Sequence, residues 1–501
     1  MSKTRRRAAG HTPLRTVGEL AERVGGRVEG ERSVRVTGVT HDSRRVRPGD
    51  LFAAIPGFER DGHAFVAEAV LAGAVAVMVE RAGPWPVPAV VVADVRRALG
   101  AASQAIWGDP TRELAVAGIT GTNGKTTTSF LTAAVLEALY GETAILGTLG
   151  LRRGEQKIET GFTTPEASDV ARMIAELVAD GVQALSMEVS SHALELGRVE
   201  GIEFDAGAFT NLSPEHLDFH GTMEEYGQVK LGFFRRLAEL DAVAAVNADD
   251  PWADRFVKAG PRRTLRYALE DSRADVYAES YDGNPAGTGL TVRTPAGRFE
   301  TRLKLAGRFN AANALTAASI GIGLGLEPDR VGAALENVER VAGRYEVYRD
   351  GGVTVVLDYA HTPLAFERIL RTVRDSGAAR MFCIFGSGGE RDRGKRPLMA
   401  RIAGELADVV YVTVDNPRRE PLDQIMADTL SGLEGTAAVW ERIDDRGAAI
   451  RRAIVEEARP GDVVCLLGKG DEGYQLVGTV KHPYSDREEA RKALAERVVE
   501  S

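Results

Sequence analysis

The chain has 501 residues, of which 44% are hydrophobic and 27% are charged, so its composition is that of a folded globular protein and excludes a largely disordered chain. At about 150 residues per domain, this length predicts about three domains. Lys and Arg number 63 and Asp and Glu number 72. The resulting net charge of −9 argues against a broad nucleic-acid-binding face but leaves room for a local basic pocket that binds a small anion.

Cysteine usage and hydropathy bear on the compartment. Cys383 and Cys465 lie in short apolar runs and have no metal-ligand spacing, which predicts reduced cysteines buried in strands. No apolar run approaches the ~18 residues of a membrane helix, and no signal-peptide pattern is present. We therefore expect a cytoplasmic protein without a membrane span.

Three segments of the chain differ in the pattern of strands and helices that their sequence predicts. Residues 1–111 mix short strands with small helices and end in a linker-like stretch at 107–110. Residues 112–343 and 344–501 each alternate apolar strands with helices, which is typical of parallel sheets covered on both faces. We predict an α/β protein of three domains with these boundaries.

The strongest local motif is GITGTNGKTT at 118–127, between an apolar strand and a helix. Glycines let backbone amides approach a phosphate, and the N-terminus of the helix adds positive potential. Lys125 would contact the β- and γ-phosphates, and Thr126 would offer a hydroxyl to Mg²⁺. Ile119 departs from the strict Walker pattern, and an ordinary glycine-rich turn is the less favoured alternative.

Two later segments offer metal ligands. Glu188 ends the apolar strand of MEVSSH, where a carboxylate would suit Mg²⁺, although it could also be a strand-end residue in solvent. His216 and His220 have the spacing of zinc ligands on a helix, but there is no clear third ligand. One histidine near Mg²⁺ or substrate is the better interpretation, and a purely structural role stays open.

Helical spacing places Lys230 on one face with Tyr226, Phe233 and Phe234. Desolvation among aromatic rings would lower the pKa of the lysine and favour the neutral amine, which CO₂ can carbamylate. From the residues alone, a lysine whose amine extends to solvent is the favoured reading.

Four polar loops follow four strands of the last segment. They read DYAHTP from 358, GSGGERDRGKRP from 386, DNPRRE from 415 and GKGDE from 468. Four such loops at strand ends indicate one site, and the cationic run in the second suggests capture of a carboxylate or phosphate.

Together these motifs, in this order and with GRFNAANALTA and GRYE, resemble the Mur ligase family over about residues 39–474. The resemblance implies a UDP-binding N-terminal domain, a central P-loop-type parallel-sheet ATPase domain and a Rossmann-like C-terminal domain that binds an amino acid. It also implies an ATP-dependent amide-bond-forming ligase of peptidoglycan precursor synthesis that works through an acyl phosphate.

The resemblance assigns site residues by group. The catalytic residues are Lys125, Glu188, His216 and Lys230, and the Mg²⁺ ligands are Thr126, Glu188, His216 and carbamylated Lys230. ATP is assigned to Gly121, Thr122, Asn123, Gly124, Lys125, Thr126, Thr127, Asn313, Arg344, Asp358 and His361. The UDP-muramoyl-peptide is assigned to Ser43, Thr163, Thr164, Ser190, Arg198 and Lys230. The amino acid is assigned to Arg391, Asp415, Asn416, Pro417, Arg418, Gly468 and Glu472.

The DNPR form resembles that of members that add meso-diaminopimelate to UDP-N-acetylmuramoyl-L-alanyl-D-glutamate, since Arg418 would bind the second carboxylate. The alternatives are lysine or another amine, or a non-catalytic module gated by nucleotide. We expect small-molecule partners only, no nucleic acid, and a monomer. The chain departs from the family pattern at Glu215, Leu364, Ser387, Glu390 and Asp471.

Overall fold

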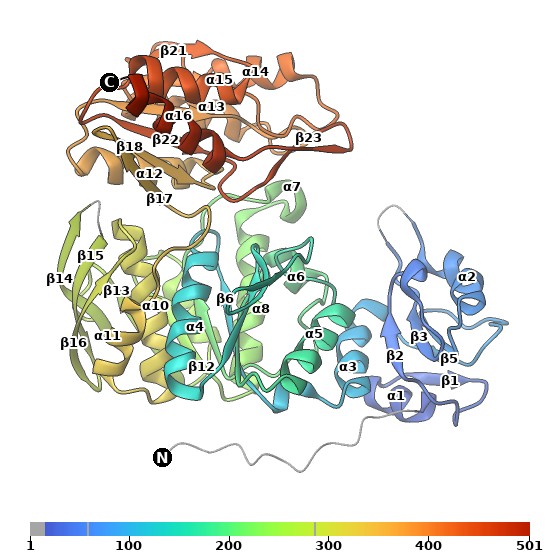
Figure 1. The fold of residues 1–501 in the computed structure, drawn as a ribbon. Coiled ribbons are helices and arrows are strands. Elements are labelled where there is room, and N and C mark those ends of the chain that lie inside the picture. The colour runs from blue at the N-terminus through green and yellow to red at the C-terminus, as the bar shows by residue number, and fades with distance from the viewer. Residues whose placement is uncertain (1–15, 58–59, 285–286, 501) are drawn as a thin grey trace.

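The structure is a computed structural model that describes residues 16–57, 60–284 and 287–500. Three large sheets follow one another along the chain, and a two-stranded sheet follows the third (Figure 1). The N-terminal sheet lies beside the central one, and the C-terminal sheet lies above the central one. Among these described residues, no helix is long and apolar enough to cross a membrane.

The N-terminal part is a five-stranded sheet in the order β1-β5-β4-β3-β2, in which only β1 is antiparallel. Helix α1 begins with a capping box between Thr16 and Glu19. The elements are β1 (Arg27–Glu29), β2 (Gly38–Thr40), β3 (Asp50–Ala53), β4 (Ala76–Val79), β5 (Ala89–Val91), α1 (Val17–Val24), α2 (Val66–Leu71) and α3 (Val95–Ile106).

The central part holds eleven strands in the order β16-β15-β14-β13-β12-β11-β6-β10-β7-β8-β9. The middle of the sheet, from β14 to β7, is parallel, as the sequence predicts, while both edges are antiparallel hairpins that the apolar pattern did not indicate. The strands are β6 (Ala115–Thr120), β7 (Thr143–Gly147), β8 (Gly150–Arg153), β9 (Gln156–Ile158), β10 (Ala184–Glu188), β11 (Ala206–Phe209), β12 (Val243–Asn247), β13 (Arg263–Ala268), β14 (Val276–Asn284), β15 (Gly287–Thr294) and β16 (Gly297–Leu303).

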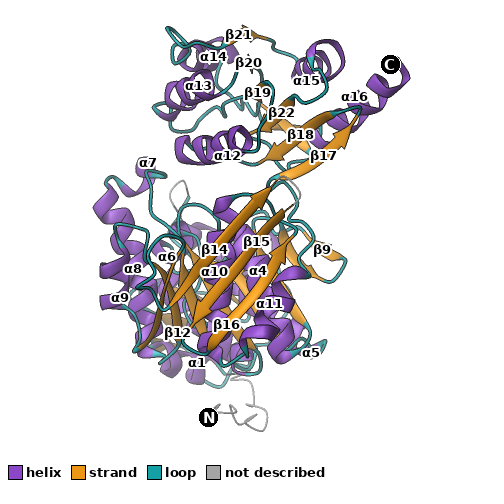
Figure 2. Ribbon diagram, turned by 90° about the vertical axis from the view of Figure 1, so that its left-hand side faces the viewer, coloured by secondary structure: helices purple, strands orange, loops and turns teal. Residues whose placement is uncertain are grey.

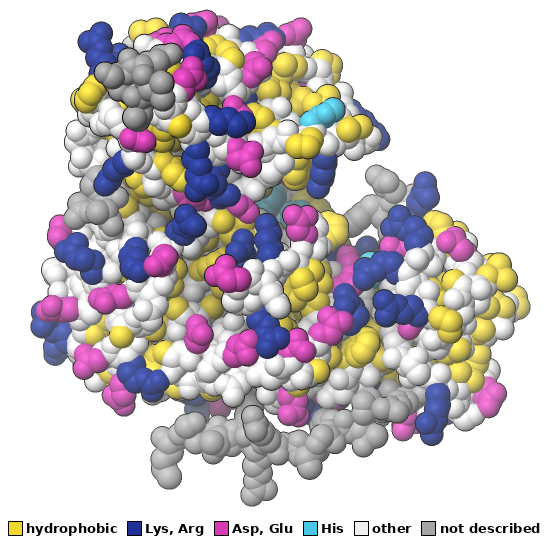
Figure 3. Space-filling view, in the orientation of Figure 1, with side chains coloured by type: hydrophobic (Ala, Val, Ile, Leu, Met, Phe, Trp, Pro, Cys, Tyr) yellow, Lys and Arg dark blue, Asp and Glu magenta, His cyan; other side chains and the backbone are white. Residues whose placement is uncertain are grey.

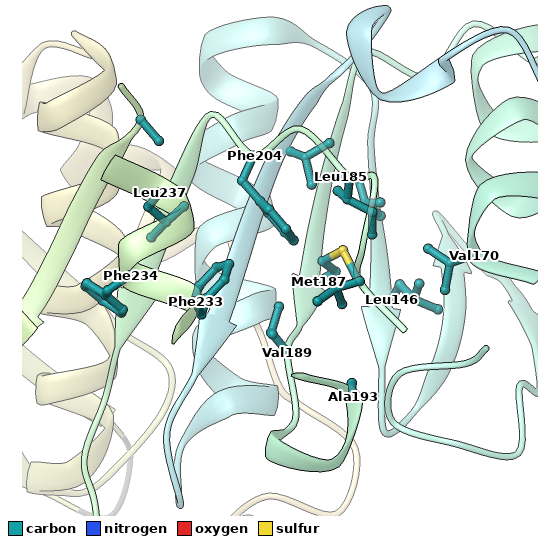
Figure 4. Packing of buried hydrophobic residues seen from close by; sticks show 14 of the residues in the cluster. Leu146, Val170, Leu185, Met187, Val189, Ala193, Phe204, Phe233, Phe234 and Leu237 are labelled. Atoms are coloured by element: carbon teal, nitrogen blue, oxygen red, sulfur yellow. The ribbon is translucent and has the colours of Figure 1, made fainter. Parts of the chain in front are cut away.

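Helices cover this sheet on both faces (Figure 2). They are α4 (Lys125–Tyr140), α5 (Ala167–Ala179), α6 (Ser191–Glu195), α7 (Leu217–His220), α8 (Met223–Glu239), α9 (Ala253–Ala259), α10 (Arg308–Leu324) and α11 (Pro328–Glu336). Figure 4 shows Phe233 and Leu237 of α8 packed near Phe204, and the Phe204 and Phe233 rings meet edge to face at 5.0 Å. This packing fixes α8, and Lys230 with it, against the sheet beside β6.

The C-terminal part has six strands in the order β17-β18-β22-β19-β20-β21, with β17 antiparallel and the rest parallel. Cys383 on β19 and Cys465 on β22 are adjacent, buried and unbridged, as predicted. The elements are β17 (Glu346–Asp350), β18 (Val353–Asp358), β19 (Met381–Phe385), β20 (Val409–Val412), β21 (Val439–Arg442), β22 (Val463–Leu467), the hairpin β23 (Tyr474–Val477) and β24 (Val480–Pro483), α12 (Pro363–Asp375), α13 (Lys395–Leu406), α14 (Leu422–Leu430), α15 (Arg446–Arg451) and α16 (Asp486–Glu500).

Strand order explains why distant motifs meet. β6 lies between β10 and β11, so the loops that follow these three strands lie side by side at one edge of the sheet. In the C-terminal sheet, β22 likewise lies between β18 and β19. The predicted domain boundaries at 111/112 and 343/344 fall between the sheets and stay predictions.

Candidate active site

A cavity of about 1480 Å³ lies between the central and C-terminal parts. On the face drawn in Figure 3 the surface is hollowed between the C-terminal and N-terminal parts. Most of the predicted site residues line the cavity: Thr122, Asn123, Gly124, Lys125, Thr126, Thr127, Thr163, Thr164, Glu188, Ser190, Arg198, His216, Asn313, Arg344, Asp358, His361, Arg391, Asp415, Asn416, Arg418, Gly468 and Glu472. Gly121, Lys230, Pro417 and Ser43 are not among its lining residues.

The glycine loop runs from β6 into α4. Gly124 has a φ of 85°, and a Cβ there would lie 2.5 Å from Oδ1 of Asn313, so a larger residue would meet both strain and a clash. Nζ of Lys125 donates to the carbonyls of Gly121 (3.1 Å) and Thr122 (2.7 Å), and burial lowers the pKa of this lysine. The side chain of Lys125 therefore folds back onto its own loop and is held at the N-terminus of α4.

The loop after β11 supports the glycine loop from the other side. Oδ1 of Asn211 accepts from the backbone N of Asn123 at 3.1 Å, and its Nδ2 donates to the Asn123 carbonyl at 3.0 Å. Oγ1 of Thr122 accepts from the backbone N of Ser213 at 3.0 Å. Asn211 is not among the site residues predicted from the sequence, and only the adjacency of β6 and β11 shows what it contacts.

Glu188 ends β10 with 1% of its surface exposed. Its carboxylate accepts from the backbone N and the hydroxyl of Thr148, at 2.8 and 3.2 Å. This burial rules out the alternative of a strand-end residue in solvent. Thr148 follows the neighbouring β7, and sequence analysis missed it because a lone threonine after a strand carries no signal.

His216 directly precedes α7 as its N-cap and has a left-handed conformation, with a φ of 57°. Its ring lies edge-on to His192 at 4.7 Å, and burial lowers the pKa of His216 to about 4, so its imidazole is neutral at pH 7. In the part of the chain that the structure describes, no three side chains of His, Cys, Asp or Glu are grouped as metal ligands, so the structure adds no third ligand of these types to His216 and His220.

Two contacts join the C-terminal part to this wall. Nη2 of Arg344 donates to Oγ1 of Thr126 at 3.2 Å, and Nε2 of His361 lies 3.0 Å from Oε1 of Glu215. Burial alone would raise the pKa of Glu215, but the hydrogen bond with His361 and the surrounding positive charge hold it below its usual range.

Asp358 organises the start of the loop that carries His361. Its carboxylate accepts from the backbone N of Tyr345 at 2.7 Å and of Ala360 at 2.6 Å. Burial nevertheless raises the pKa of this carboxyl. Asp358 thus ties the segment after Gly343 to the end of β18, on the side of the cavity where Arg344 also lies.

Lys230 is 1% exposed and lies directly behind the glycine loop. Its Nζ donates to the Gly121 carbonyl at 3.0 Å and lies 4.6 Å from the centre of the Tyr226 ring. Burial lowers the pKa of this lysine well below its ordinary value. The favoured reading from residues alone, an amine that extends to solvent, is therefore wrong.

The residues assigned to the muramoyl-peptide divide between two places. Thr164 donates its hydroxyl to the Glu188 carbonyl at 2.8 Å, and Arg198 donates to the Thr164 carbonyl at 3.2 Å. These two and Ser190 therefore lie together beside Glu188. Ser43 lies in the N-terminal part instead, where its hydroxyl contacts Glu68 at 3.2 Å.

The opposite wall carries the residues assigned to the amino acid. Arg418 has a φ of 54°, and its Nη1 donates to the Gly389 carbonyl at 2.7 Å. Nδ2 of Asn416 donates to Oε2 of Glu472 at 2.8 Å. Pro417 lies between Asn416 and Arg418 in the chain and is not among the residues that line the cavity, and its assignment to the amino acid stays a prediction.

The cationic run is divided in its roles. Arg391 and Lys395 line the cavity, whereas Arg393 pairs with Asp428. Arg396 is fully buried, pairs with Glu420 and Asp428, and donates to the Gly388 carbonyl at 3.1 Å. The interpretation of the whole run as anion-binding is therefore wrong for the two arginines that support the loop.

Comparison with known proteins agrees with this arrangement. Residues 35–120, 119–321 and 343–470 match three family models, described as Mur ligase family, catalytic domain; Mur ligase middle domain; and Mur ligase, glutamate ligase domain. The chain belongs to the Mur ligase family. This confirms the resemblance that the motifs carry.

Relatives within the Mur ligase family cover nearly the whole chain. A UDP-N-acetylmuramoyl-L-alanyl-D-glutamate–2,6-diaminopimelate ligase of Geobacter metallireducens is 42% identical over 495 residues, covering 93% of this chain and 96% of the relative. A protein of Roseiflexus sp. named UDP-N-acetylmuramyl-tripeptide synthetase is 43% identical, covering 92% and 95%.

Solved structures of Mur ligases share the fold. A UDP-N-acetylmuramoyl-L-alanyl-D-glutamate–2,6-diaminopimelate ligase matches with a TM-score of 0.70 and 31% identity, covering 97% of this chain and 100% of that one. A MurF ligase of Thermotoga maritima in complex with ADP matches with a TM-score of 0.64 at 19% identity, covering 93% and 98%.

The ion pair between the buried Arg396 and the partly buried Glu420 gives a prediction for this Mur ligase. The hydrogen bond from Arg396 lowers the pKa of Glu420 to about 2 from its ordinary value of 4.5. Since the folded-state pKa is depressed, the stabilisation is complete above about pH 4.5 and is lost as pH falls towards 2. We expect Glu420→Gln to lower the urea midpoint at about pH 7, and to lower it much less at about pH 3.

The control is Glu434→Gln, which changes an exposed carboxylate of the same part of the chain. Its effect should stay within about 0.5 kcal/mol at both pH values. A loss of stability in Glu420→Gln that is as large at low pH as at neutral pH would contradict the pairing.

Proposed function

We propose that the chain uses ATP to join meso-2,6-diaminopimelate to UDP-N-acetylmuramoyl-L-alanyl-D-glutamate, a step of peptidoglycan precursor synthesis. One observation carries the proposal: a single cavity has the glycine loop and Glu188 on one wall and Arg418, Asn416 and Glu472 on the other. Such a cavity can hold three molecules at once: a nucleotide, a substrate whose carboxylate receives the phosphate, and an amino acid. The names of the relatives support this substrate pair.

The proposed reaction has two steps. A carboxylate oxygen of the glutamate attacks the γ-phosphorus of ATP, the bond to ADP breaks, and an acyl phosphate forms. The amine then attacks the acyl carbon, the bond to phosphate breaks, the nitrogen loses a proton and the amide remains. Both steps bring anions together, so the positive charges of Lys125 and Arg344 at the loop lower the barrier.

ATP is proposed to lie on the glycine loop (Gly121 to Thr127), between Asn313 on one side and Arg344, Asp358 and His361 on the other. The amides at the start of α4 would donate to phosphate oxygens. Lys125 now donates to two loop carbonyls, and these neutral acceptors would give way to a phosphate, because hydrogen bonds between charged groups are stronger.

Mg²⁺ is proposed as the metal. The buried Glu188 carboxylate and the Thr126 hydroxyl are hard oxygen donors, and the neutral imidazole of His216 lies on the same side of the cavity, so these side chains fit the ion. When bound, Mg²⁺ supplies further neutralisation of phosphate charge. Lys230, as a carbamate, is proposed as an additional ligand.

The muramoyl-peptide is proposed to contact Thr163, Thr164, Ser190 and Arg198 in the cavity, with its UDP group reaching Ser43 in the N-terminal part. Arg391, Arg418, Asp415, Asn416, Gly468 and Glu472 are proposed to bind the amino acid, with Arg418 on the carboxylate far from the reacting amine. We further propose a cytoplasmic monomer without nucleic-acid partners, divided at 111/112 and 343/344.

The function is tested by measuring phosphate release from ATP with UDP-N-acetylmuramoyl-L-alanyl-D-glutamate and each of several amines. We expect release that depends on diaminopimelate, because only this amine offers Arg418 a second carboxylate, and a tripeptide product in the same amount. Release that ignores the amine would refute the ligase in favour of a nucleotide-gated module. Turnover with lysine but not with diaminopimelate would refute only the choice of amine.

Replacing Arg418 by Ala should raise KM for diaminopimelate about 10- to 100-fold, since a charge-assisted hydrogen bond is lost. KM for ATP should stay nearly unchanged, because Arg418 lies on the other wall of the cavity. Steady-state kinetics with each substrate varied in turn measures both constants. Equal increases in the two constants would count against a role in the amino-acid pocket.

Lys230 should carry one added CO₂ in the native protein kept in bicarbonate buffer, because its buried amine favours the neutral form that reacts. Native mass spectrometry of the intact chain, with Lys230→Gln as the reference, measures the addition. An identical mass increment in Lys230→Gln would locate the CO₂ elsewhere, and no increment in either protein would refute the carbamate.

A further inference from the structure

Lys469, between the pocket residues Gly468 and Glu472, has no role in the site described above. It follows β22, its side chain is 0% exposed, and it does not line the cavity. Its Nζ donates to Oδ1 of Asp415 at 3.0 Å, to Oδ1 of Asn416 at 3.3 Å and to Oε2 of Glu472 at 3.2 Å. An ammonium has three donors, and all three act on residues of the amino-acid pocket.

These contacts fix how the pocket presents its polar atoms. Oδ1 of Asn416 also accepts from the backbone N of Leu476 at 2.9 Å, so the amide of Asn416 must turn its Nδ2 towards Glu472. Oε2 of Glu472 therefore accepts from both Asn416 and Lys469. A network in which each member is satisfied by the others is rigid.

The charged side chains of the amino-acid pocket lie in two layers, one that lines the cavity and one behind it. Arg391 and Arg418 face the cavity with Asp415 and Glu472, whereas Lys469 contacts both carboxylates from behind. Arg418 itself donates to a neutral carbonyl, that of Gly389. The carboxylates of the pocket thus already have a cation, while the arginines remain available for an anion.

We propose that Lys469 is a positioning residue that also sets the specificity of the amino-acid pocket, by holding Asp415, Asn416 and Glu472 in place and by neutralising the two carboxylates against a lone ammonium. The proposal rests on the function proposed above. An amine whose far end has both a carboxylate and an ammonium finds a complement for each charge. The far end of lysine brings only an ammonium, which meets carboxylates that already pair with Lys469 and an arginine, Arg418, whose hydrogen bond goes to a neutral carbonyl.

The test is Lys469→Met, which keeps the length of the side chain and removes its charge and its donors. We measure kcat/KM for diaminopimelate and for lysine, and KM for ATP. Without Lys469 the pocket has one positive charge less, so a lone ammonium gains relative to a zwitterionic end. We expect the ratio of kcat/KM for diaminopimelate to that for lysine to fall about tenfold or more, with KM for ATP within about twofold of wild type.

A merely structural role would give a different result. Misplaced pocket residues without a charge effect would lower kcat/KM for both amines equally, and an unchanged ratio therefore overturns the proposal. The matched control is Lys492→Met, which removes an exposed lysine of α16 that pairs with Glu489. This variant should leave kcat/KM for both amines unchanged.

Two further measurements keep the outcomes distinct. If Lys469→Met does not fold, as shown by loss of the thermal transition of the wild type, Lys469→Gln takes its place. Glutamine retains two donor hydrogens but no charge. The same ratio of kcat/KM values is measured, and an unchanged ratio again overturns the proposal. The wild-type ratio is measured first. If the wild type does not use diaminopimelate, the proposed function is refuted. If the wild type uses diaminopimelate and the variant keeps the wild-type ratio of kcat/KM values, only the role of Lys469 is refuted.

Discussion

The arrangement of the active site depends on the parallel pairing of β6 with β10 on one side and β11 on the other. Parallel strands end at the same edge, so the glycine loop, Glu188 and Asn211 come together although up to about ninety residues separate them. The apolar packing of α8 under the same strands brings Lys230 behind the loop. The C-terminal sheet repeats this principle around β22.

A second constraint is that the cavity needs both sheets. Arg344 contacts Thr126, and His361 contacts Glu215, so two residues of the C-terminal part complete the wall that surrounds the glycine loop. Asp471, one of the departures from the family pattern, adds an ion pair with Lys157 of β9 at 3.5 Å and another with Arg487 at 3.0 Å. The C-terminal part is thus joined to the central part by polar contacts at the cavity and by apolar packing, in which the ring of Phe309 meets that of Tyr345 at 5.6 Å.

Buried cations are a recurring device in this fold. Lys125 and Lys230 donate to backbone carbonyls of the glycine loop, and Lys469 donates to side chains of the amino-acid pocket. Arg446 pairs with Asp486 where both side chains are fully buried, and also donates to the Leu467 carbonyl at 2.9 Å. Since Gly468 and Lys469 follow Leu467 directly, this pair supports the amino-acid pocket from below.

The sequence by itself determined the class of fold, the three segments, the glycine loop and the family, because each depends on local spacing: glycines before a helix, apolar runs of strand length, polar loops at strand ends. It also predicted which face of α8 holds Lys230. The tertiary structure decided which residues meet. Thr148 at Glu188, Glu215 at His361 and Lys469 at three pocket residues all depend on strand order and domain placement. Local sequence cannot encode such contacts, because burial and charge partners are set by segments far apart in the chain.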